Sequence, residues 1–168
     1  MQKYAFRRYT PKYRAFFILE KRKILKALIS RAKIEHVGST AIPGLGGKGI
    51  LDILVGIKKS EMVKARKKLV EAGYEFRKKA SHPGRFFFRK DYPYTNGKRR
   101  VHIHLVELKG RSWKEMIAFR HYLLEHQKDA KRYSEIKKEA VKESLGDGKK
   151  YRRYKERFIL NILRKALK

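Results

Sequence analysis

The strongest structural signal in the chain is residues 35–57, which read EHVGSTAIPGLGGKGILDILVGI. Glycines are concentrated over 38–49, and this composition predicts an irregular loop. Residues 50–57 are almost all Ile, Leu and Val, as in a strand that is buried on both faces. A short strand is predicted just before the loop, at 34–37. The segment therefore predicts a strand, a loop and a central strand in succession.

Asp52 stands inside this apolar run and is one of four aspartates in the chain. Burying a carboxylate without partners is costly, so its side chain is either hydrogen-bonded for structural reasons or placed to hold a cation. The glycine-rich loop leads directly into this strand. Backbone amides and a carboxylate therefore come together, as a metal-bound triphosphate requires. We expect Asp52 to be functional.

The regions on either side of this segment predict helices. Apolar residues at helical spacing predict a first helix at 12–31. After the central strand, Ser60 is placed to cap a second helix and Gly73 to end it. The apolar side chains that this second helix is expected to bury are Met62, Ala65, Leu69 and Val70.

The second half of the chain predicts a hairpin followed by helices. Asn96-Gly97 is a strong hairpin signal, and Ser112 and Glu115 have the spacing of a capping box. The predicted elements are strands at 74–76, 85–89 and 100–108 and helices at 112–126, 129–143 and 150–167. The expected fold class is α+β. It is a single domain over 1–168, with a mixed β-sheet, an N-terminal helix, one crossover helix and three C-terminal helices packed around the sheet.

The chain of 168 residues carries 46 Lys and Arg against 16 Asp and Glu, a net charge of +30. Clustered positive charge attracts phosphates. We therefore expect a nucleoside triphosphate or another phosphate-bearing small molecule as a partner, or RNA or another polyanion. The alternative is a charged surface adapted to a hot or salty cytoplasm. With 42% hydrophobic and 12% aromatic residues, we expect a folded core rather than a disordered chain.

Several classes of protein are excluded. The sequence has no apolar window of membrane-spanning length and no secretion signal at its start, so we expect a cytoplasmic protein without a membrane partner. Without cysteines it has no disulfide, no cysteine zinc site and no thiol nucleophile. Gly44, Gly46 and Gly49 match GxGxxG, but the pattern leads into a strand instead of opening a helix. It is therefore not a dinucleotide fingerprint.

Five blocks of sequence are distinctive together, namely residues 35–45 (EHVGSTAIPGL), 48–55 (KGILDILV), 101–106 (VHIHLV), 119–123 (FRHYL) and 151–159 (YRRYKERFI). They resemble the GrpB-like family of the nucleotidyltransferase (polymerase-β-like) superfamily. The blocks extend over most of the chain in the family's order, and the first of them is specific. The resemblance implies a nucleotidyltransferase-like α+β core with helices packed around it.

The resemblance also implies site residues. Gly38 and Ser39, with Thr40 beside them, would bind the phosphates of a nucleoside triphosphate, and Asp52 would be the catalytic carboxylate that binds Mg²⁺ or Mn²⁺. The chain departs from the superfamily where a second carboxylate is expected, because that position is Leu54. In-line nucleotidyl transfer needs a metal pair held by carboxylates. Nucleotide binding is therefore predicted, and catalytic competence is left open.

Two histidines stand where the superfamily has a third carboxylate. His102 and His104 are two residues apart on a predicted strand, so their side chains share one face. If Asp52 meets them, the three residues form a two-histidine, one-carboxylate set for Mn²⁺, Fe²⁺ or Zn²⁺. A metal-dependent hydrolase is then an alternative function. Equally, the imidazoles can hydrogen-bond Asp52 or a phosphate with no metal.

Further basic residues are candidates for phosphate binding. Lys48 lies in the loop, and Lys155 lies on the packed side of its predicted helix, either as a ligand residue or with its ammonium group in water. Arg120 is followed by His121 where most relatives carry Asp, so we expect Arg120 to lack a salt-bridge partner and to be free for phosphate. We interpret His36 as an anchor of the loop.

A second alternative is a basic RNA-binding or nucleic-acid-binding module without catalysis. Lysines and arginines of the first helix and the C-terminal helices alternate with tyrosines, as in surfaces that bind polyanions. The same tyrosines lie at the apolar positions of those helices, where they are also explained as core residues. Binding that falls steeply with salt and does not depend on Asp52 would support this alternative.

Overall fold

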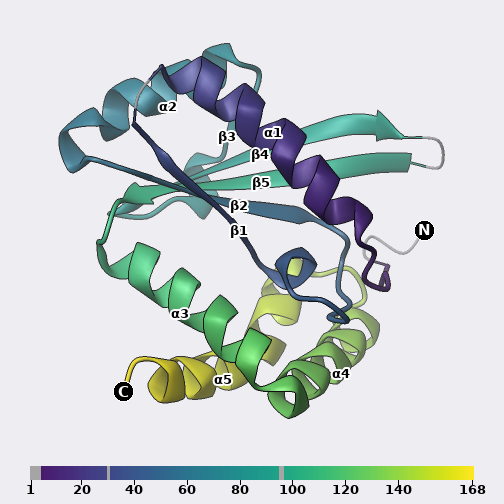
Figure 1. Cartoon of the computed structure of the whole chain (residues 1–168). Helices are drawn as coiled ribbons and strands as arrows, with labels where there is room; N and C mark the ends of the chain where they lie inside the picture. Colours follow the sequence, from purple (N-terminus) through teal and green to yellow (C-terminus); the bar gives the residue numbers. More distant parts are fainter. Residues whose placement is uncertain (1–4, 30, 95–96) are drawn as a thin grey trace.

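The computed structural model describes residues 5–29, 31–94 and 97–168. Within these residues, five strands form one mixed sheet in the order β1-β2-β5-β4-β3. The strands are β1 (Lys33–Val37), β2 (Leu51–Ile57), β3 (Glu75–Phe76), β4 (Arg85–Tyr94) and β5 (Gly97–Glu107). The structure confirms the predicted α+β class with a mixed sheet, and β2, the apolar run of the sequence, lies inside it (Figure 1).

The register of the sheet decides which side chains meet. β2 and β5 are parallel, whereas the other neighbouring pairs are antiparallel. Asp52 lies opposite His102, and Leu54 lies opposite His104. Because side chains alternate between the faces of a sheet, Asp52 and the two histidines share one face.

The other face of the sheet is covered by α1 (Lys12–Leu28) and α2 (Met62–Glu71) (Figure 1). The alternate residues of β2 and β5 are fully buried here, as Leu51, Ile53, Val55, Val101, Ile103 and Leu105. This cluster is the larger part of the core. It fixes the register that brings Asp52 to the opposite face.

A buried polar network crosses this apolar face. Glu20 of α1 is fully buried, and its Oε1 accepts hydrogen bonds from the hydroxyls of Tyr74, at 2.6 Å, and Tyr92, at 2.7 Å. Its Oε2 lies 3.2 Å from Nζ of Lys23. Both oxygens of this carboxylate are thus satisfied within the chain.

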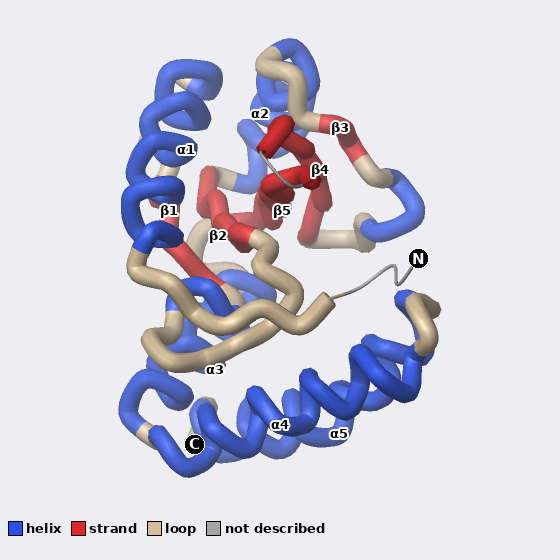
Figure 2. Tube along the Cα trace, turned by 90° about the vertical axis from the view of Figure 1, so that its right-hand side faces the viewer, coloured by secondary structure: helices blue, strands red, loops and turns tan. Residues whose placement is uncertain are grey.

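Three C-terminal helices lie on the face that carries Asp52. They are α3 (Arg111–Glu125), α4 (Gln127–Ser144) and α5 (Gly148–Ala166), and α4 and α5 lie side by side below the sheet (Figure 2). Leu54 packs with Trp113 of α3 in a separate buried cluster. Gly56 makes this contact possible, because a Cβ there would lie 2.6 Å from the indole ring. α3 therefore covers one half of this face.

Several predicted helix ends differ from the structure. The helix predicted at 12–31 ends at Leu28, where Ile29 turns left-handed with φ of 50°. Ser60 lies in a 3-10 turn before α2, and its side chain makes no capping hydrogen bond. The prediction that Val70 is buried was wrong, since it is 48% exposed.

The predicted capping box was also wrong. α3 begins at Arg111, and Glu115 binds that residue, with Nε and Oε1 2.8 Å apart, instead of the backbone of Ser112. α5 instead has the side-chain cap, because Asp147 accepts from the amide of Lys149 at 2.7 Å.

Two predictions concern the chain between elements. The glycine-rich loop is irregular as predicted, except for one 3-10 turn at Ser39–Ala41. The Asn96-Gly97 turn lies in part outside the described residues, and the strands on either side of it pair antiparallel. No helix within the described ranges combines the length and the apolar character needed to cross a membrane.

Candidate functional site

A cavity of about 700 Å³ lies between the Asp52 face of the sheet and helices α4 and α5. Strands β2, β4 and β5 form one wall, and the two helices form the other (Figure 2). Its ionisable lining residues are Lys48, Asp52, Arg77, Lys79, His82, Arg85, Arg89, Arg100, His102, His104, Tyr133, Lys137, Tyr151, Arg152 and Lys155. The cavity therefore joins residues from both halves of the chain.

Asp52 lies in the wall of the cavity with both histidines against it. Its Oδ1 is 3.2 Å from Nδ1 of His102 and 3.5 Å from Nε2 of His104, and its side chain is 25% exposed. Burial opposes ionisation, but the two imidazoles hold the pKa of Asp52 well below its usual range. Burial lowers the pKa of His104 despite the nearby carboxylate. Asp52 is thus an anion beside a neutral His104 ring at neutral pH.

Gly38 holds the loop directly against this carboxylate. Its φ is +73°, a conformation that favours glycine. A Cβ at this position would lie 2.5 Å from Oδ2 of Asp52. The backbone can therefore pass Asp52 only because residue 38 has no side chain, and the next residue, Ser39, enters the cavity lining.

Lys137 is the most buried cation of the cavity, at 2% exposure. Its ammonium group donates to the carbonyl oxygen of Gly46 and lies 4.7 Å from the ring centre of Tyr133. A Cβ at Gly47 would lie 3.1 Å from this ammonium and 2.7 Å from Oγ of Ser39. Lys137 and Ser39 are therefore neighbours across the loop.

Two further lysines share the ring of Tyr151. Nζ of Lys48 lies 3.7 Å from the ring centre and Nζ of Lys155 lies 4.5 Å from it, at distances typical of cation–π contacts. Burial, and then the charge of Lys155, lowers the pKa values of Lys48 and Lys137 to about 7. Burial lowers that of Lys155 to about 8. These ammonium groups are therefore held close together at a cost in free energy.

Thr40 lies outside this cavity lining. Its hydroxyl donates to the carbonyl of Ile50, at 3.3 Å, and lies 2.9 Å from Nε2 of His36. The ring of His36 stacks on Phe17 with centroids 5.0 Å apart, and burial lowers its pKa to about 4. His36 anchors the loop, as predicted, and the hydroxyl of Thr40 serves the same turn.

Arg120 also lies away from the cavity, and the expectation that it lacks a salt-bridge partner was wrong. Its Nη1 donates to Oε2 of Glu35 at 2.9 Å and to the carbonyl of His36 at 2.7 Å. Glu35 of β1 therefore supplies the carboxylate that pairs with Arg120, in place of an Asp at position 121. Arg120 lines a second cavity of about 370 Å³ on the far side of the Thr40 turn.

Several cationic residues of the cavity were missed by the sequence analysis. They come from the β3–β4 region and from β4, β5, α4 and α5, namely Arg77, Lys79, Arg85, Arg89, Arg100, Lys137 and Arg152. Arg85 and Arg89 share a face of β4 with Phe87. The ring centroid of Phe87 lies 4.8 Å from that of His102 and 5.2 Å from that of His104. For Arg85 and Arg89 the two-residue spacing of β4 was the available signal, but it does not say which face of the strand meets the cavity.

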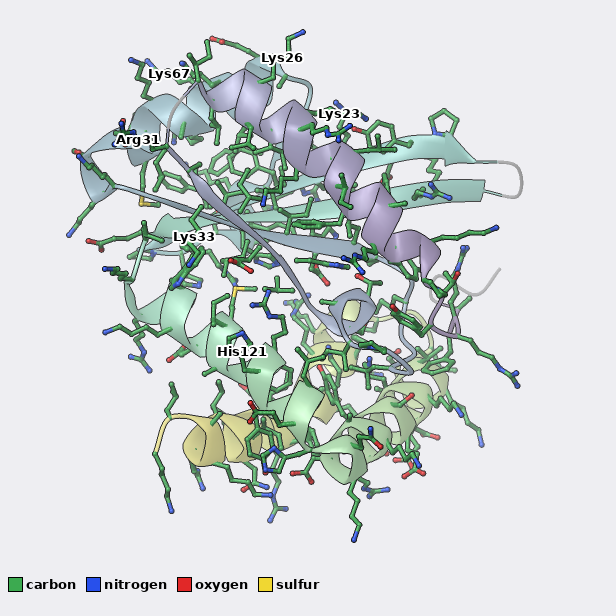
Figure 3. The ribbon with its side chains drawn as sticks, in the orientation of Figure 1. Lys23, Lys26, Arg31, Lys33, Lys67 and His121 are labelled. Atoms are coloured by element: carbon green, nitrogen blue, oxygen red, sulfur yellow. The ribbon has the colours of Figure 1, made fainter. Side chains whose placement is uncertain are left out.

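The charge of the cavity wall is strongly one-sided. In the part of the chain that the structure describes, nine lysines and arginines line it together with a single carboxylate, that of Asp52. Positive charge also lies elsewhere, since Lys23, Lys26, Arg31 and Lys67 stand around α1 and α2 (Figure 3). The cavity differs from that surface because its cations line one concave space.

This donor set does not fit the pair of divalent metals that nucleotidyl transfer uses. Leu54, at the position expected for a second carboxylate, is fully buried against Trp113. His102 and His104 face one oxygen of Asp52 instead of a common metal position. Among the described residues, no group of three or more His, Cys, Asp or Glu side chains is arranged to hold a metal ion.

Comparisons with known proteins agree with the sequence resemblance. A family model described as GrpB protein matches residues 4–165. A glutamate-rich protein GrpB of Alkalihalophilus pseudofirmus is 34% identical over 132 residues, which are 77% of this chain and 76% of that protein. A UPF0157 protein of Pseudomonas aeruginosa is 35% identical over 138 residues, 80% of this chain and 55% of that protein.

Solved structures share the fold. The conserved protein GrpB from Enterococcus faecalis has a TM-score of 0.83 at 28% identity, with 97% of both chains covered. Cid1 in complex with its short product ApU has a TM-score of 0.50 at 16% identity, over 77% of this chain and 40% of that one. The second likeness concerns the nucleotidyltransferase-like fold alone. Since the family model spans nearly all of the sequence, the chain belongs to the GrpB family.

Proposed function

We propose that the cavity binds a polyphosphorylated ligand, with a nucleoside triphosphate as the leading candidate. The observation that carries the proposal is that nine lysines and arginines and one carboxylate line about 700 Å³. Three of the nine, Arg77, Arg89 and Arg100, pair with Glu75 or Asp91 outside the lining, which leaves six cations against Asp52. A low-dielectric cavity lined by one sign of charge attracts the opposite sign strongly. Solved structures of Cid1, which has a related fold, include one with the UTP analogue UMPNPP.

The lysines of the helical wall support a phosphate chain as the ligand. Lys48, Lys137 and Lys155 have lowered pKa values because they are buried close to other cations. A bound polyanion relieves this repulsion and favours their charged forms. Ser39, beside Lys137, adds a hydroxyl that donates to a phosphate oxygen. We assign the phosphate chain to this wall.

The proposal concerns binding rather than nucleotidyl transfer. The cations of the wall neutralise the phosphates directly, so binding does not depend on Mg²⁺ or Mn²⁺. Asp52 repels the ligand by its charge and holds the histidines by its contacts with them. In a protein that used Asp52 as a metal ligand, chelation of the metal would abolish binding.

Titration calorimetry with sodium triphosphate and with ATP tests this proposal, in EDTA and again with Mg²⁺ or Mn²⁺. We expect both ligands to bind in EDTA and to raise the melting temperature. Lys137→Met is expected to weaken both ligands at least tenfold, because it removes the most buried ammonium group. Lys131→Met on the same helix is the matched control, since Lys131 is exposed and outside the cavity lining. It should change the affinity less than twofold.

Two outcomes would contradict the proposal. One is a melting curve that neither ligand moves, with or without a metal. The other is equal weakening by the Lys137 and Lys131 variants. RNA binding that ignores both substitutions and falls steeply with salt would support the alternative of a polyanion-binding surface instead.

A further inference from the structure

Two buried nitrogen atoms in the cavity wall have no hydrogen-bond partner within the described ranges. They are Nε of Arg85 and Nδ1 of His104. A third such atom, Nε of Arg120, belongs to the separate cavity beside His36. Buried polar atoms in folded proteins are almost always hydrogen-bonded. Two unpaired atoms in one cavity are therefore the places where a ligand group or a water molecule would supply hydrogen-bond partners.

The two atoms belong to neighbouring strands. Phe87 of β4 lies opposite His104 of β5, and Arg85 precedes Phe87 by two residues. Arg85 and His104 are thus diagonal neighbours on one face of the sheet, at a spacing of about 7–8 Å that long side chains can span. The ring of Phe87, 5.2 Å from that of His104, lies beside them. One small group is within reach of both side chains.

The two atoms need opposite partners. Nε2 of His104 lies 3.5 Å from Oδ1 of Asp52, so the neutral ring carries its hydrogen on Nε2, where a lone pair would be repelled by the carboxylate. Nδ1 of His104 is then a hydrogen-bond acceptor. Nε of Arg85 can only donate.

Few chemical groups satisfy both atoms. A phosphate or carboxylate oxygen accepts from Arg85 but has no hydrogen to donate to His104. An ammonium group donates to His104 but is repelled by the guanidinium group of Arg85. A hydroxyl group accepts from Arg85 and donates to His104 at the same time.

We propose that Arg85 and His104 form a hydroxyl-binding subsite, so that the ligand is a phosphate ester of a sugar or another polyol. The inference rests on the proposed function, because it takes the phosphate chain to lie against the lysines of α4, α5 and the loop. It gives Asp52 a positioning role: its carboxylate faces Nε2 of His104 and so leaves Nδ1 as the hydrogen-bond acceptor.

The test compares two ligands of equal charge, ATP and 2′,3′-dideoxy-ATP, with sodium triphosphate as the probe of the phosphate chain alone. We expect ATP to bind the wild-type protein at least tenfold more tightly than the dideoxy compound in titration calorimetry. In Arg85→Met and in His104→Phe this ratio should fall below two. Because the readout is a ratio, the lost charge of Arg85 affects both ligands equally and cancels.

Arg77→Met is the matched control, since Arg77 is an arginine of the same cavity whose Nη1 pairs with Glu75. It should weaken ATP and the dideoxy compound alike and leave their ratio unchanged. Thermal melting verifies that each variant is folded, and either Arg85→Met or His104→Phe is sufficient to decide the outcome.

Three results would overturn the inference in distinguishable ways. A wild-type ratio near one, with triphosphate still bound, refutes the hydroxyl subsite and leaves the proposed function standing. A tenfold ratio that survives both substitutions means that the hydroxyl is bound by other residues. Failure of triphosphate and ATP to bind at all refutes the proposed function and this inference together.

Discussion

Two carboxylates lie on opposite faces of the same sheet, and their surroundings differ in kind. Glu20 is fully buried beneath α1 and receives hydrogen bonds from two tyrosine hydroxyls and an ion pair from Lys23. Asp52 is 25% exposed in a cavity wall, with two imidazoles against one of its oxygens. One carboxylate completes a closed network, and the other faces a space surrounded by cations.

This difference separates a carboxylate whose hydrogen bonds are made within the chain from one that faces a cavity. Around Glu20 the donors are supplied by α1, β4 and the chain before β3, so nothing is left for a ligand to contribute. In the cavity that contains Asp52, two residues each retain an unpaired buried nitrogen. These residues are Arg85 and His104. Residue type alone would not distinguish the two carboxylates. Their burial, and the hydrogen bonds left unmade by the residues around them, do.

The largest effect on stability is expected at Glu20. Glu20→Met removes the acceptor of both tyrosine hydroxyls. The buried hydroxyl of Tyr74 is then left without a partner, whereas that of Tyr92 keeps the ammonium group of Lys23. This should lower the free energy of unfolding by about 3 kcal/mol. Urea denaturation measures the loss, and triphosphate affinity should not change. Adding Tyr74→Phe removes the unpaired hydroxyl and should recover part of the loss. A loss below about 1 kcal/mol would contradict the closed network.

Asp52→Asn should have opposite effects on the free protein and on binding. The free protein loses its one cavity carboxylate and should be destabilised by about 2 kcal/mol. Its triphosphate affinity in EDTA should rise, by about tenfold, because one negative charge beside the ligand is gone. Calorimetry and urea denaturation measure the two changes. A rise in EDTA that becomes a fall when Mg²⁺ or Mn²⁺ is added would show that Asp52 attracts the ligand through a metal ion; a fall in EDTA would contradict the prediction.

The same residue sets an acid limit on stability. The pKa of Asp52 is lower in the folded protein than its ordinary value of 3.8. Its contribution is therefore complete above that pH and is lost as the pH falls towards the folded value. The difference in stability between the wild type and Asp52→Asn should accordingly shrink below about pH 4.

Ligand binding should also weaken at high pH. The free cavity loses protons between pH 6 and 9, because Lys48 and Lys137 have pKa values of about 7 and Lys155 one of about 8. A bound phosphate chain raises these pKa values. The affinity for triphosphate should therefore fall at least tenfold from pH 7 to pH 9, with proton uptake on binding at pH 8. Calorimetry in buffers of different ionisation enthalpy measures that uptake. A pH-independent affinity would contradict it.

The smallest effect is expected at two helix ends, one on each side of the sheet. Ile29 after α1 and Leu145 after α4 are exposed and left-handed, with φ of 50° and 46°. Replacing either one with glycine should raise the free energy of unfolding by about 0.5–1 kcal/mol. Thermal and urea denaturation measure the gain. Neither substitution should alter ligand affinity, because Ile29 and Leu145 lie outside the cavity lining. The two faces of the sheet differ in their unpaired polar groups, whereas the helix ends on both faces have the same left-handed conformation.

Much of the fold could be predicted because its signals are local. The apolar run of β2, the glycines before it and the helical spacing of α1 are all read within one element. The shared face of His102 and His104 also followed from the two-residue period of a strand. The family resemblance implied that Gly38 and Asp52 lie in one site. The structure gives the physical reason for their closeness, because Gly38 has no Cβ that would clash with Asp52.

The cationic wall could not be predicted in the same way, because it depends on which distant segments meet. Arg85 reaches the cavity through the pairing of β4 with β5, and Arg152 through the packing of α5 on α4. Lys137 is the exception. It lies four residues after Tyr133 and three before Ala140 on the buried stripe of α4, so helical spacing alone indicated its burial.

The contact between Gly38 and Asp52 has a consequence for how the sequence can evolve. The space that a Cβ of residue 38 would need is occupied by the carboxylate of residue 52. Replacing Asp52 with the longer Glu would push its acid group into the same space. Neither position can accept a larger residue unless the other changes, so we expect residues 38 and 52 to change together. A second-site suppressor of Gly38→Ala should carry a smaller residue at position 52.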